Sequence, residues 1–190
     1  MERLILASAS PRRRELLAQA GLAFEVIPAE VTENEEPSAE PCAMVLHNAA
    51  LKADWVADRH PDATVLGADT TVFIDRTVLN KPRHRDEARA MLRRLSGRTH
   101  TVFTGLALRR RRDGLKIDRG VASEVTFRVL SDVMIDDYLQ RVHTLDKAGG
   151  YAIQEEGDRI VESYKGSMTN IIGLPLDETK QLLTLAGLTR

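Results

Sequence analysis

A cluster of arginines follows a serine and a proline near the amino end of the chain. Ser10 is a favourable helix N-cap and Pro11 a favourable first helical residue, so residues 12–14 are predicted to form the first turn of a helix. The amino end of a helix carries partial positive charge, so each exposed cation placed there costs roughly 0.3–1 kcal/mol. A phosphate group bound to the free N–H groups would reverse the sign of that interaction. Phosphate binding and a solvated basic face screened by salt both fit these residues.

A single carboxylate interrupts an otherwise apolar stretch in the first half of the chain. Asp69 follows the run 64–68 and comes just before a second apolar run, 71–74. Both runs have the β-branched character of buried strands, so Asp69 is predicted near the end of a strand, where α/β folds place ligand chemistry. A metal ligand, a general base and the cap of a turn all fit this position.

Three other charged residues gain no role from their local sequence. Glu33 lies in an acidic loop, where a solvated glutamate is the common case. Lys52 belongs to a predicted long helix, and Lys81 comes just before a proline in a loop. Taken one at a time, both lysines are typical of a protein surface.

Several common kinds of site lack their signature here. The chain contains neither the glycine-rich P-loop ending in Gly-Lys-Ser/Thr nor a Gly-x-Gly-x-x-Gly segment after the first strand. The five histidines have no close metal-binding spacing. Cys42 is the only cysteine, which rules out an internal disulfide and a thiolate zinc cluster and favours a packing role.

The overall composition limits the class of partner. The 190 residues are 43% hydrophobic and 29% charged, with a formal net charge of −1, which is typical of a globular protein. This balance argues against nucleic acid or an anionic membrane as the main partner. The four arginines at 109–112 are predicted to be a solvated turn. No apolar run approaches the ~20 residues of a membrane span. The apolar run 4–7 is too short for the hydrophobic region of a signal sequence, so a cytoplasmic location is expected.

The pattern of elements predicts one α/β domain over residues 1–190. Short apolar, β-branched runs predict strands at 4–7, 23–28, 63–68, 71–74, 78–79, 99–108, 116–129, 151–154 and 159–164. Capping residues and helical periodicity predict helices at 11–20, 39–59, 86–95, 131–140 and 175–186.

Taken together, the segments that carry these residues resemble the Maf family of nucleotide pyrophosphatases from Ser8 to Pro175. Order and spacing both agree with the family, which a chance match to one motif would not supply. The matching segments are Ser8-Ala9-Ser10-Pro11-Arg12-Arg13, Glu33, Lys52-Ala53, Gly67-Ala68-Asp69-Thr70, Lys81-Pro82, Leu95-Ser96-Gly97-Arg98-Thr99-His100, Asp146-Lys147-Ala148-Gly149, Gly166-Ser167, Asn170 and Gly173-Leu174-Pro175.

The resemblance implies an enzyme that hydrolyses a nucleoside triphosphate to its monophosphate and pyrophosphate, and so cleans the nucleotide pool. It implies a bilobed α/β domain with a mixed central sheet and a cleft, like that of the inosine triphosphate pyrophosphatases. It also implies a divalent metal cofactor, Mg²⁺ or Mn²⁺, at Glu33 and Asp69. Asp69 matches the family's proposed base, and Glu33, Lys52 and Lys81 match other catalytic positions.

The substrate-binding residues implied by the resemblance are Ser8, Ser10, Arg12, Arg13, Thr70 and Gln154. Of these, Arg12, Thr70 and Gln154 resemble the specificity determinants of the dTTP/UTP-hydrolysing subgroup. Two departures qualify the resemblance: the first is small and should be tolerated, and the second bears on substrate preference rather than on reaction type. Ala9 replaces a frequent glycine, and His47-Asn48 stands where an arginine and an apolar residue are common.

Other functions stay open at this point. A pyrophosphatase for 7-methyl-GTP or another modified or purine nucleotide would use the same cleft. A non-catalytic nucleotide sensor or cell-division regulator would bind nucleotide without releasing pyrophosphate. A nucleic-acid module would rely on the basic tip at 109–112, but the chain lacks a broad basic surface. The expected partner is thus a nucleoside triphosphate rather than nucleic acid or membrane, and a homodimer is left open.

Overall fold

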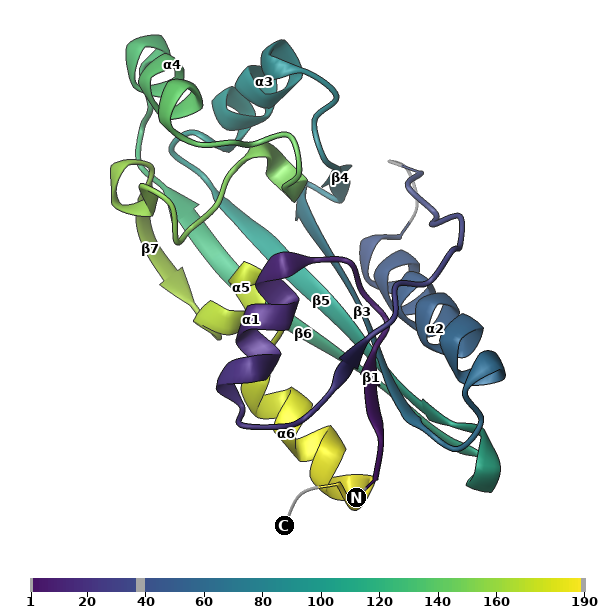
Figure 1. The fold of residues 1–190 in the computed structure, drawn as a ribbon. Helices are drawn as coiled ribbons and strands as arrows, with labels where there is room; N and C mark the ends of the chain where they lie inside the picture. Colours follow the sequence, from purple (N-terminus) through teal and green to yellow (C-terminus); the bar gives the residue numbers. More distant parts are fainter. Residues whose placement is uncertain (1, 37–39, 189–190) are drawn as a thin grey trace.

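The computed structural model describes residues 2–36 and 40–188. Within them, strands and helices form the predicted α/β fold around one mixed sheet, whose strand order is β2-β1-β3-β5-β6-β7 with β4 paired to β3 (Figure 1). β1 is parallel to β2 and β3, and the other pairs are antiparallel. The strands are β1 (Leu4–Leu6), β2 (Glu25–Val26), β3 (Thr64–Ile74), β4 (Thr77–Leu79), β5 (Thr99–Arg110), β6 (Leu115–Phe127) and β7 (Val161–Lys165).

Helices cover both faces of this sheet. They are α1 (Pro11–Gln19), α2 (Pro41–Arg59), α3 (Arg85–Leu95), α4 (Asp132–Arg141), α5 (Met168–Ile172) and α6 (Leu176–Leu185). In Figure 1, α2 lies along one side of the long strands, whereas α1, α5 and α6 lie together on another. The described part of the chain has no helix long and apolar enough to cross a membrane.

Alternation along β3 explains this layering. Leu66 and Ala68 pack with leucines of α1 and α6, whereas Val65 packs with the alanines of α2. Successive residues of a strand point to opposite faces, so one strand supplies both cores. The backbone of α2 approaches the sheet closely because Gly105 of β5 has no side chain, and a Cβ there would lie 2.9 Å from the Val45 oxygen.

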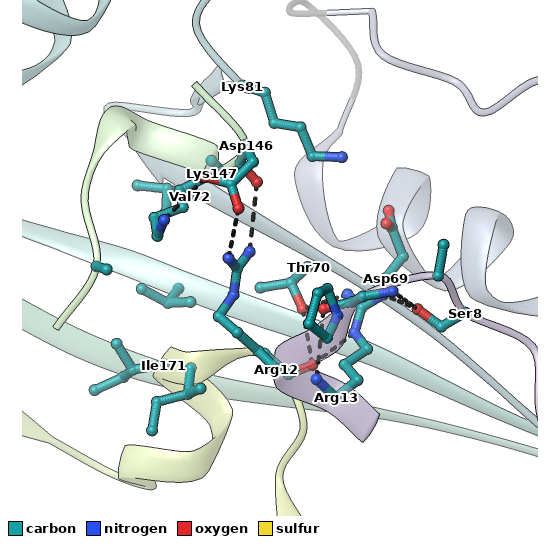
Figure 2. A pocket seen from close by; sticks show the side chains of 18 of the residues that line it. Ser8, Arg12, Arg13, Asp69, Thr70, Val72, Lys81, Asp146, Lys147 and Ile171 are labelled. Atoms are coloured by element: carbon teal, nitrogen blue, oxygen red, sulfur yellow. Dashed lines mark hydrogen bonds and ion pairs between the residues drawn. The ribbon is translucent and has the colours of Figure 1, made fainter. Parts of the chain in front are cut away.

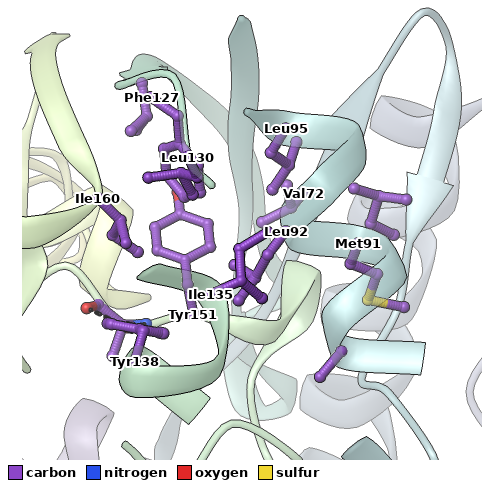
Figure 3. Packing of buried hydrophobic residues seen from close by; sticks show 14 of the residues in the cluster. Val72, Met91, Leu92, Leu95, Phe127, Leu130, Ile135, Tyr138, Tyr151 and Ile160 are labelled. Atoms are coloured by element: carbon purple, nitrogen blue, oxygen red, sulfur yellow. Dashed lines mark hydrogen bonds between the residues drawn. The ribbon is translucent and has the colours of Figure 1, made fainter. Parts of the chain in front are cut away.

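A third core lies at the other end of the molecule and gives the protein its two-part form. Aromatic residues from the end of β6, from α4 and from the following loop pack against the apolar face of α3 (Figure 3). Tyr138 and Phe127 are almost fully buried in this cluster. The two lobes are joined by the long strands β3, β5 and β6.

Several predicted boundaries are corrected by the structure. The two strands expected at 63–68 and 71–74 are one continuous strand, β3, because β5 pairs along its whole middle. Residues 151–154 form no strand, and β2 is much shorter than predicted. α5 was not predicted. The predicted start of the second helix, at Ala39, lies outside the described residues, and that helix begins at Pro41 with Glu40 as its cap.

Continuity of β3 changes the place of Asp69, which lies mid-strand and not near a strand end. One edge of β3 pairs with β5 throughout, with Asp69 opposite Gly105. The other edge pairs with β1 only as far as Leu66 and with β4 only from Val72. Residues 67–71 therefore face a gap in the sheet, where backbone groups of β3 are free to meet side chains.

The four arginines at the β5–β6 turn are not the solvated turn predicted from their sequence. Arg109 is only 4% exposed at its side chain and pairs with Asp54 of α2 and Asp118 of β6. Arg110, also buried, pairs with Glu2 and Asp113. The remaining two are paired with carboxylates as well. These ion pairs tie the hairpin to α2 and to the amino end, so the tip offers little free positive charge to a nucleic acid.

Candidate active site

A cavity of about 350 Å³ opens at the gap beside β3. Its lining comes from the start of α1, the loop before α2, β3 itself, the 146–154 segment and the end of α5 (Figure 2). All the site residues predicted from the sequence line this cavity: Ser8, Ser10, Arg12, Arg13, Glu33, Lys52, Asp69, Thr70, Lys81 and Gln154. The structure thus brings together residues that are far apart along the chain.

The amino end of α1 forms one wall of the cavity. Ser10 caps the helix as predicted, because its Oγ accepts a hydrogen bond from the Arg13 amide at 3.4 Å. Ser8 Oγ accepts from the Ser10 amide at 3.3 Å. The first turn has no acidic residue to balance its positive end. This wall therefore favours an anion.

Arg13 is a buried support of the site. Its guanidinium donates to the Ala68 and Gly173 carbonyl oxygens, each at 2.9 Å. It also donates to Ser8 Oγ at 3.1 Å and to Thr70 Oγ1 at 3.0 Å. Burial lowers the pKa of Arg13 from its usual value. Four of its five N–H groups are thus used inside the protein, and one of them serves the β3 carbonyl left free by the gap.

Thr70 is held in the same network. Besides Arg13, its hydroxyl contacts Thr104 Oγ1 at 2.9 Å and the Gly173 oxygen at 3.3 Å. Its side chain points to the face of β3 opposite the one that carries Asp69, as strand alternation requires. Thr70 thus lines the cavity while its hydroxyl is held by Arg13, Thr104 and the Gly173 carbonyl.

Arg12 spans the cavity and meets the other lobe. Its Nη1 donates to Asp146 Oδ2 at 2.8 Å, and its Nη2 donates to the Asp146 carbonyl at 3.4 Å (Figure 2). Lys147 Nζ also contacts Asp146, at 2.9 Å. Burial of Asp146 opposes ionisation, but the hydrogen bonds from Lys147 and Arg12 outweigh it and lower its pKa to about 2. This bridge is therefore ionised throughout the neutral pH range. No individual role was predicted for Asp146 and Lys147 from the sequence.

The carboxylates of the site share one ammonium. Lys52 Nζ lies 2.6 Å from Glu33 Oε2 and 3.0 Å from Asp69 Oδ1. The Lys52 side chain is only 10% exposed, so its surface-like sequence context was misleading. Asn48, one helical turn earlier on the same face of α2, donates to Asp69 Oδ2 at 3.1 Å. Each oxygen of Asp69 therefore has a donor of its own.

Lys81 and Gln154 complete the lining from exposed positions. Lys81 follows β4 and extends its amine along the cavity in Figure 2. Among the described residues, no carboxylate pairs with Lys81, so its charge is available to an anion. Gln154 lies on the loop that was predicted to be a strand.

One end of the cavity is apolar, in contrast to the charged end at α1 and α2. Its side chains come from β3, β5, the 151–153 segment and α5, and they are Val72, Val102, Tyr151, Ile153 and Ile171. A site with a cationic end and an apolar end suits a ligand that carries both phosphate and a flat, weakly polar ring.

Tyr151 is supported from behind by a buried histidine. His100 Nε2 lies 2.8 Å from the Tyr151 hydroxyl, and the two rings meet edge to face. Burial lowers the pKa of His100 to about 4. His100 is therefore neutral in the folded protein at pH 5–7.

This burial predicts a specific pH dependence of stability. The unfolded chain takes up a proton on His100 near pH 6.5, whereas the folded chain does so only near pH 4. The stability due to neutral His100 is thus complete above about pH 6.5 and is lost as the pH falls to about 4. This difference between the folded and unfolded pKa of His100 changes the free energy of unfolding by about 3 kcal/mol, since one pKa unit is about 1.4 kcal/mol. Urea unfolding at pH 7 and pH 4.5 should show a smaller pH effect in His100→Phe than in the wild type. Equal pH effects would contradict this role.

The carboxylates fit a metal that arrives with a phosphorylated ligand. Among the described residues, no group of three or more His, Cys, Asp or Glu side chains is placed to hold a metal ion by itself. Mg²⁺ in proteins is commonly held by one or two carboxylates together with substrate phosphates and water. Glu33 and Asp69, gathered around one ammonium, supply this kind of donor set.

The fold and the cavity define an α/β protein with a cleft that has a cationic wall and an acidic pair. The solved structure of the Ham1 protein of Staphylococcus aureus matches 97% of this chain and 100% of its own, with a TM-score of 0.54 and 12% identity. That likeness confirms the fold class predicted from the sequence. The chain belongs to the Maf family, because the family model described as "Maf-like protein" matches residues 3–186.

Relatives with described activities agree with this assignment. The dTTP/UTP pyrophosphatase of Akkermansia muciniphila is 48% identical over 97% of this chain and 96% of its own length. The dTTP/UTP pyrophosphatase of Myxococcus xanthus is 50% identical over 97% of this chain and 93% of its own. Similarity thus extends over nearly the whole chain in each case.

Proposed function

We propose that this protein hydrolyses dTTP and UTP to the nucleoside monophosphate and pyrophosphate. The observation that carries the proposal is the cavity that joins the α1 amino end, two lysines and an acidic pair to an apolar wall. Relatives about half identical to this chain are named for the same activity. Residues 1–190 would act as one catalytic domain in the cytoplasm to clean the nucleotide pool. A homodimer stays a prediction.

The triphosphate would lie at the charged end of the cavity. Ser8, Ser10 and the backbone N–H of Arg12, which the Ser10 cap leaves unbonded, would hold its phosphate oxygens. Lys52 and Lys81, which both line the cavity, would neutralise charge that grows on the leaving pyrophosphate. Arg13 would contribute mainly by fixing Ser8, since most of its donors are already used.

The nucleobase would lie against the apolar wall. Arg12, Thr70 and Gln154 line the cavity and are the residues we propose to set the preference for pyrimidines. The Thr70 hydroxyl is already hydrogen bonded to Arg13 and Thr104. This supports an indirect effect of Thr70 on base preference, through the position of Arg13 and the shape of the cavity. Arg12 would have to exchange all or part of its contact with Asp146 for the nucleotide.

Glu33 and Asp69 would hold Mg²⁺ or Mn²⁺ together with the triphosphate. When bound, such a metal lowers the pKa of a coordinated water and offsets phosphate charge. Lys52 pairs with both carboxylates and offsets part of their charge, which supports a metal that binds well only when the nucleotide brings further oxygen ligands. Removal of divalent metal with EDTA is expected to abolish turnover.

Asp69 would act as the general base. It would accept one proton from the attacking water while the remaining hydroxyl forms a bond to phosphorus. The bond between the α and β phosphates would break, and its bridging oxygen would leave with pyrophosphate. Both Asp69 oxygens are hydrogen bonded on the α2 side, so the orientation of the base is fixed before substrate binds.

A pyrophosphate-release assay over a nucleotide panel tests this function. With Mg²⁺ or Mn²⁺, kcat/KM for dTTP and UTP should exceed that for 7-methyl-GTP and ITP by at least ~10-fold, about 1.4 kcal/mol of discrimination. A higher value for 7-methyl-GTP or ITP would favour the modified-nucleotide alternative. Tight dTTP binding without pyrophosphate release would favour a nucleotide sensor.

A further inference from the structure

Asn48 is a buried amide on the face of α2 that meets the cavity. Its side chain is only 2% exposed, although asparagine is mostly found at protein surfaces. It does not line the cavity itself but lies behind two residues proposed for catalysis. A buried amide is tolerated only where its hydrogen bonds are made, so its partners show what it is for.

Two of its bonds hold the loop that carries Glu33. Asn48 Oδ1 accepts from the Asn34 amide at 2.9 Å, and Asn48 Nδ2 donates to the Asn34 carbonyl at 2.9 Å. The side-chain amide thus pairs with residue 34 as a neighbouring strand would. Glu33 is the adjacent residue, and its carboxylate reaches Lys52 on the next turn of α2.

A third bond fixes Asp69. The second N–H of the Asn48 amide donates to Asp69 Oδ2 at 3.1 Å, while Lys52 occupies Asp69 Oδ1. Only an amide nitrogen can donate to both the Asn34 carbonyl and the Asp69 carboxylate, so the orientation of the amide is unambiguous. Its hydrogen-bonding groups are all used, and they connect the two carboxylates of the site.

We propose that Asn48 is a positioning residue that sets the placement of Glu33 relative to Asp69. This inference rests on the proposed function for its catalytic consequence, but the docking of the loop is independent of substrate. An apolar residue at position 48 could fill the space but could neither hold residue 34 nor donate to Asp69. Asn48 therefore links loop, helix and strand at the point where the acidic pair is formed.

Two variants separate the two tasks of the amide. Asn48→Leu removes all three hydrogen bonds. Asn48→Asp keeps an acceptor for the Asn34 amide but turns a carboxylate oxygen toward both the Asn34 carbonyl and Asp69. Ser131→Ala serves as the control, because it removes the cap of α4, lowers stability and changes no residue that lines the cavity.

Hydrogen exchange of the Asn34 amide, followed by NMR without nucleotide, should be at least ~10-fold faster in Asn48→Leu. The increase should be smaller in Asn48→Asp, which keeps the acceptor for this amide, and Ser131→Ala should leave the exchange unchanged. With dTTP, kcat should fall roughly 10- to 100-fold in both Asn48 variants, because small misplacements of reacting groups have effects of this size. Ser131→Ala should keep its kcat.

Unchanged Asn34 exchange in Asn48→Leu would overturn the inference whatever the activity. So would a kcat within about twofold of wild type in Asn48→Leu, or an equal loss in Ser131→Ala. A wild-type protein that releases no pyrophosphate would instead overturn the proposed function, since the exchange measurement needs no substrate.

Discussion

Replacement of Asp69 by asparagine is expected to lower kcat for dTTP by at least ~100-fold, the lower range for loss of a general base. The change removes the proton acceptor but keeps the size of the side chain. The amide oxygen of the variant could still accept a hydrogen bond from Lys52 or Asn48, so the fold should persist. Steady-state kinetics with purified protein, with circular dichroism as a check of folding, would measure the effect.

The matched control is Asp75→Asn. Asp75 lies in the turn between β3 and β4, pairs with Arg98 and does not line the cavity. Its backbone is in the left-handed region, which asparagine tolerates well. Activity near the wild-type level is expected for this variant. A folded Asp69→Asn protein with wild-type kcat would remove Asp69 from the role of base.

Replacement of Lys52 by methionine is expected to have the second largest effect. The variant keeps an unbranched side chain in a buried position but removes the ammonium shared by Glu33 and Asp69. Loss of one group that stabilises transition-state charge typically lowers kcat by roughly 100- to 1,000-fold, and we expect at least ~100-fold here. Pyrophosphate release from dTTP at saturating nucleotide measures it.

The Lys52→Met variant can also be tested by its affinity for metal. Without the ammonium, Mn²⁺ no longer competes with a fixed cation for Glu33 and Asp69, so Mn²⁺ should bind more tightly in the absence of nucleotide. Electron paramagnetic resonance of free Mn²⁺ would detect this. Lys165→Met, at an exposed lysine of β7, controls for the loss of one positive charge. Unaltered Mn²⁺ affinity in Lys52→Met would contradict a shared role of these carboxylates in metal binding.

Local signals in the sequence predicted most of the elements well. The first helix has the expected cap and first turn because Ser10 and Pro11 act through neighbouring backbone groups. The resemblance grouped residues that no local pattern could group, and the structure places them around one cavity. Their individual roles stay predictions.

Features that depend on distant partners could not be predicted from the sequence. Asp69 lies within a strand because β5 continues opposite it, and the gap that exposes it arises where β1 stops and β4 begins. Arg109 is buried because Asp54 of α2 and Asp118 of β6 meet it there. A run of arginines looks the same in the sequence whether its side chains are solvated or paired with carboxylates from distant segments.

The central claim is that this cleft breaks the bond between the α and β phosphates of a nucleoside triphosphate. Phosphorus-31 NMR of dTTP incubated with the protein and Mg²⁺ tests it most directly, because it identifies every phosphorylated product. Hydrolysis at this bond is expected to give dTMP and pyrophosphate in equal amounts. Formation of dTDP and inorganic phosphate, or dTTP that stays bound and intact, would contradict it.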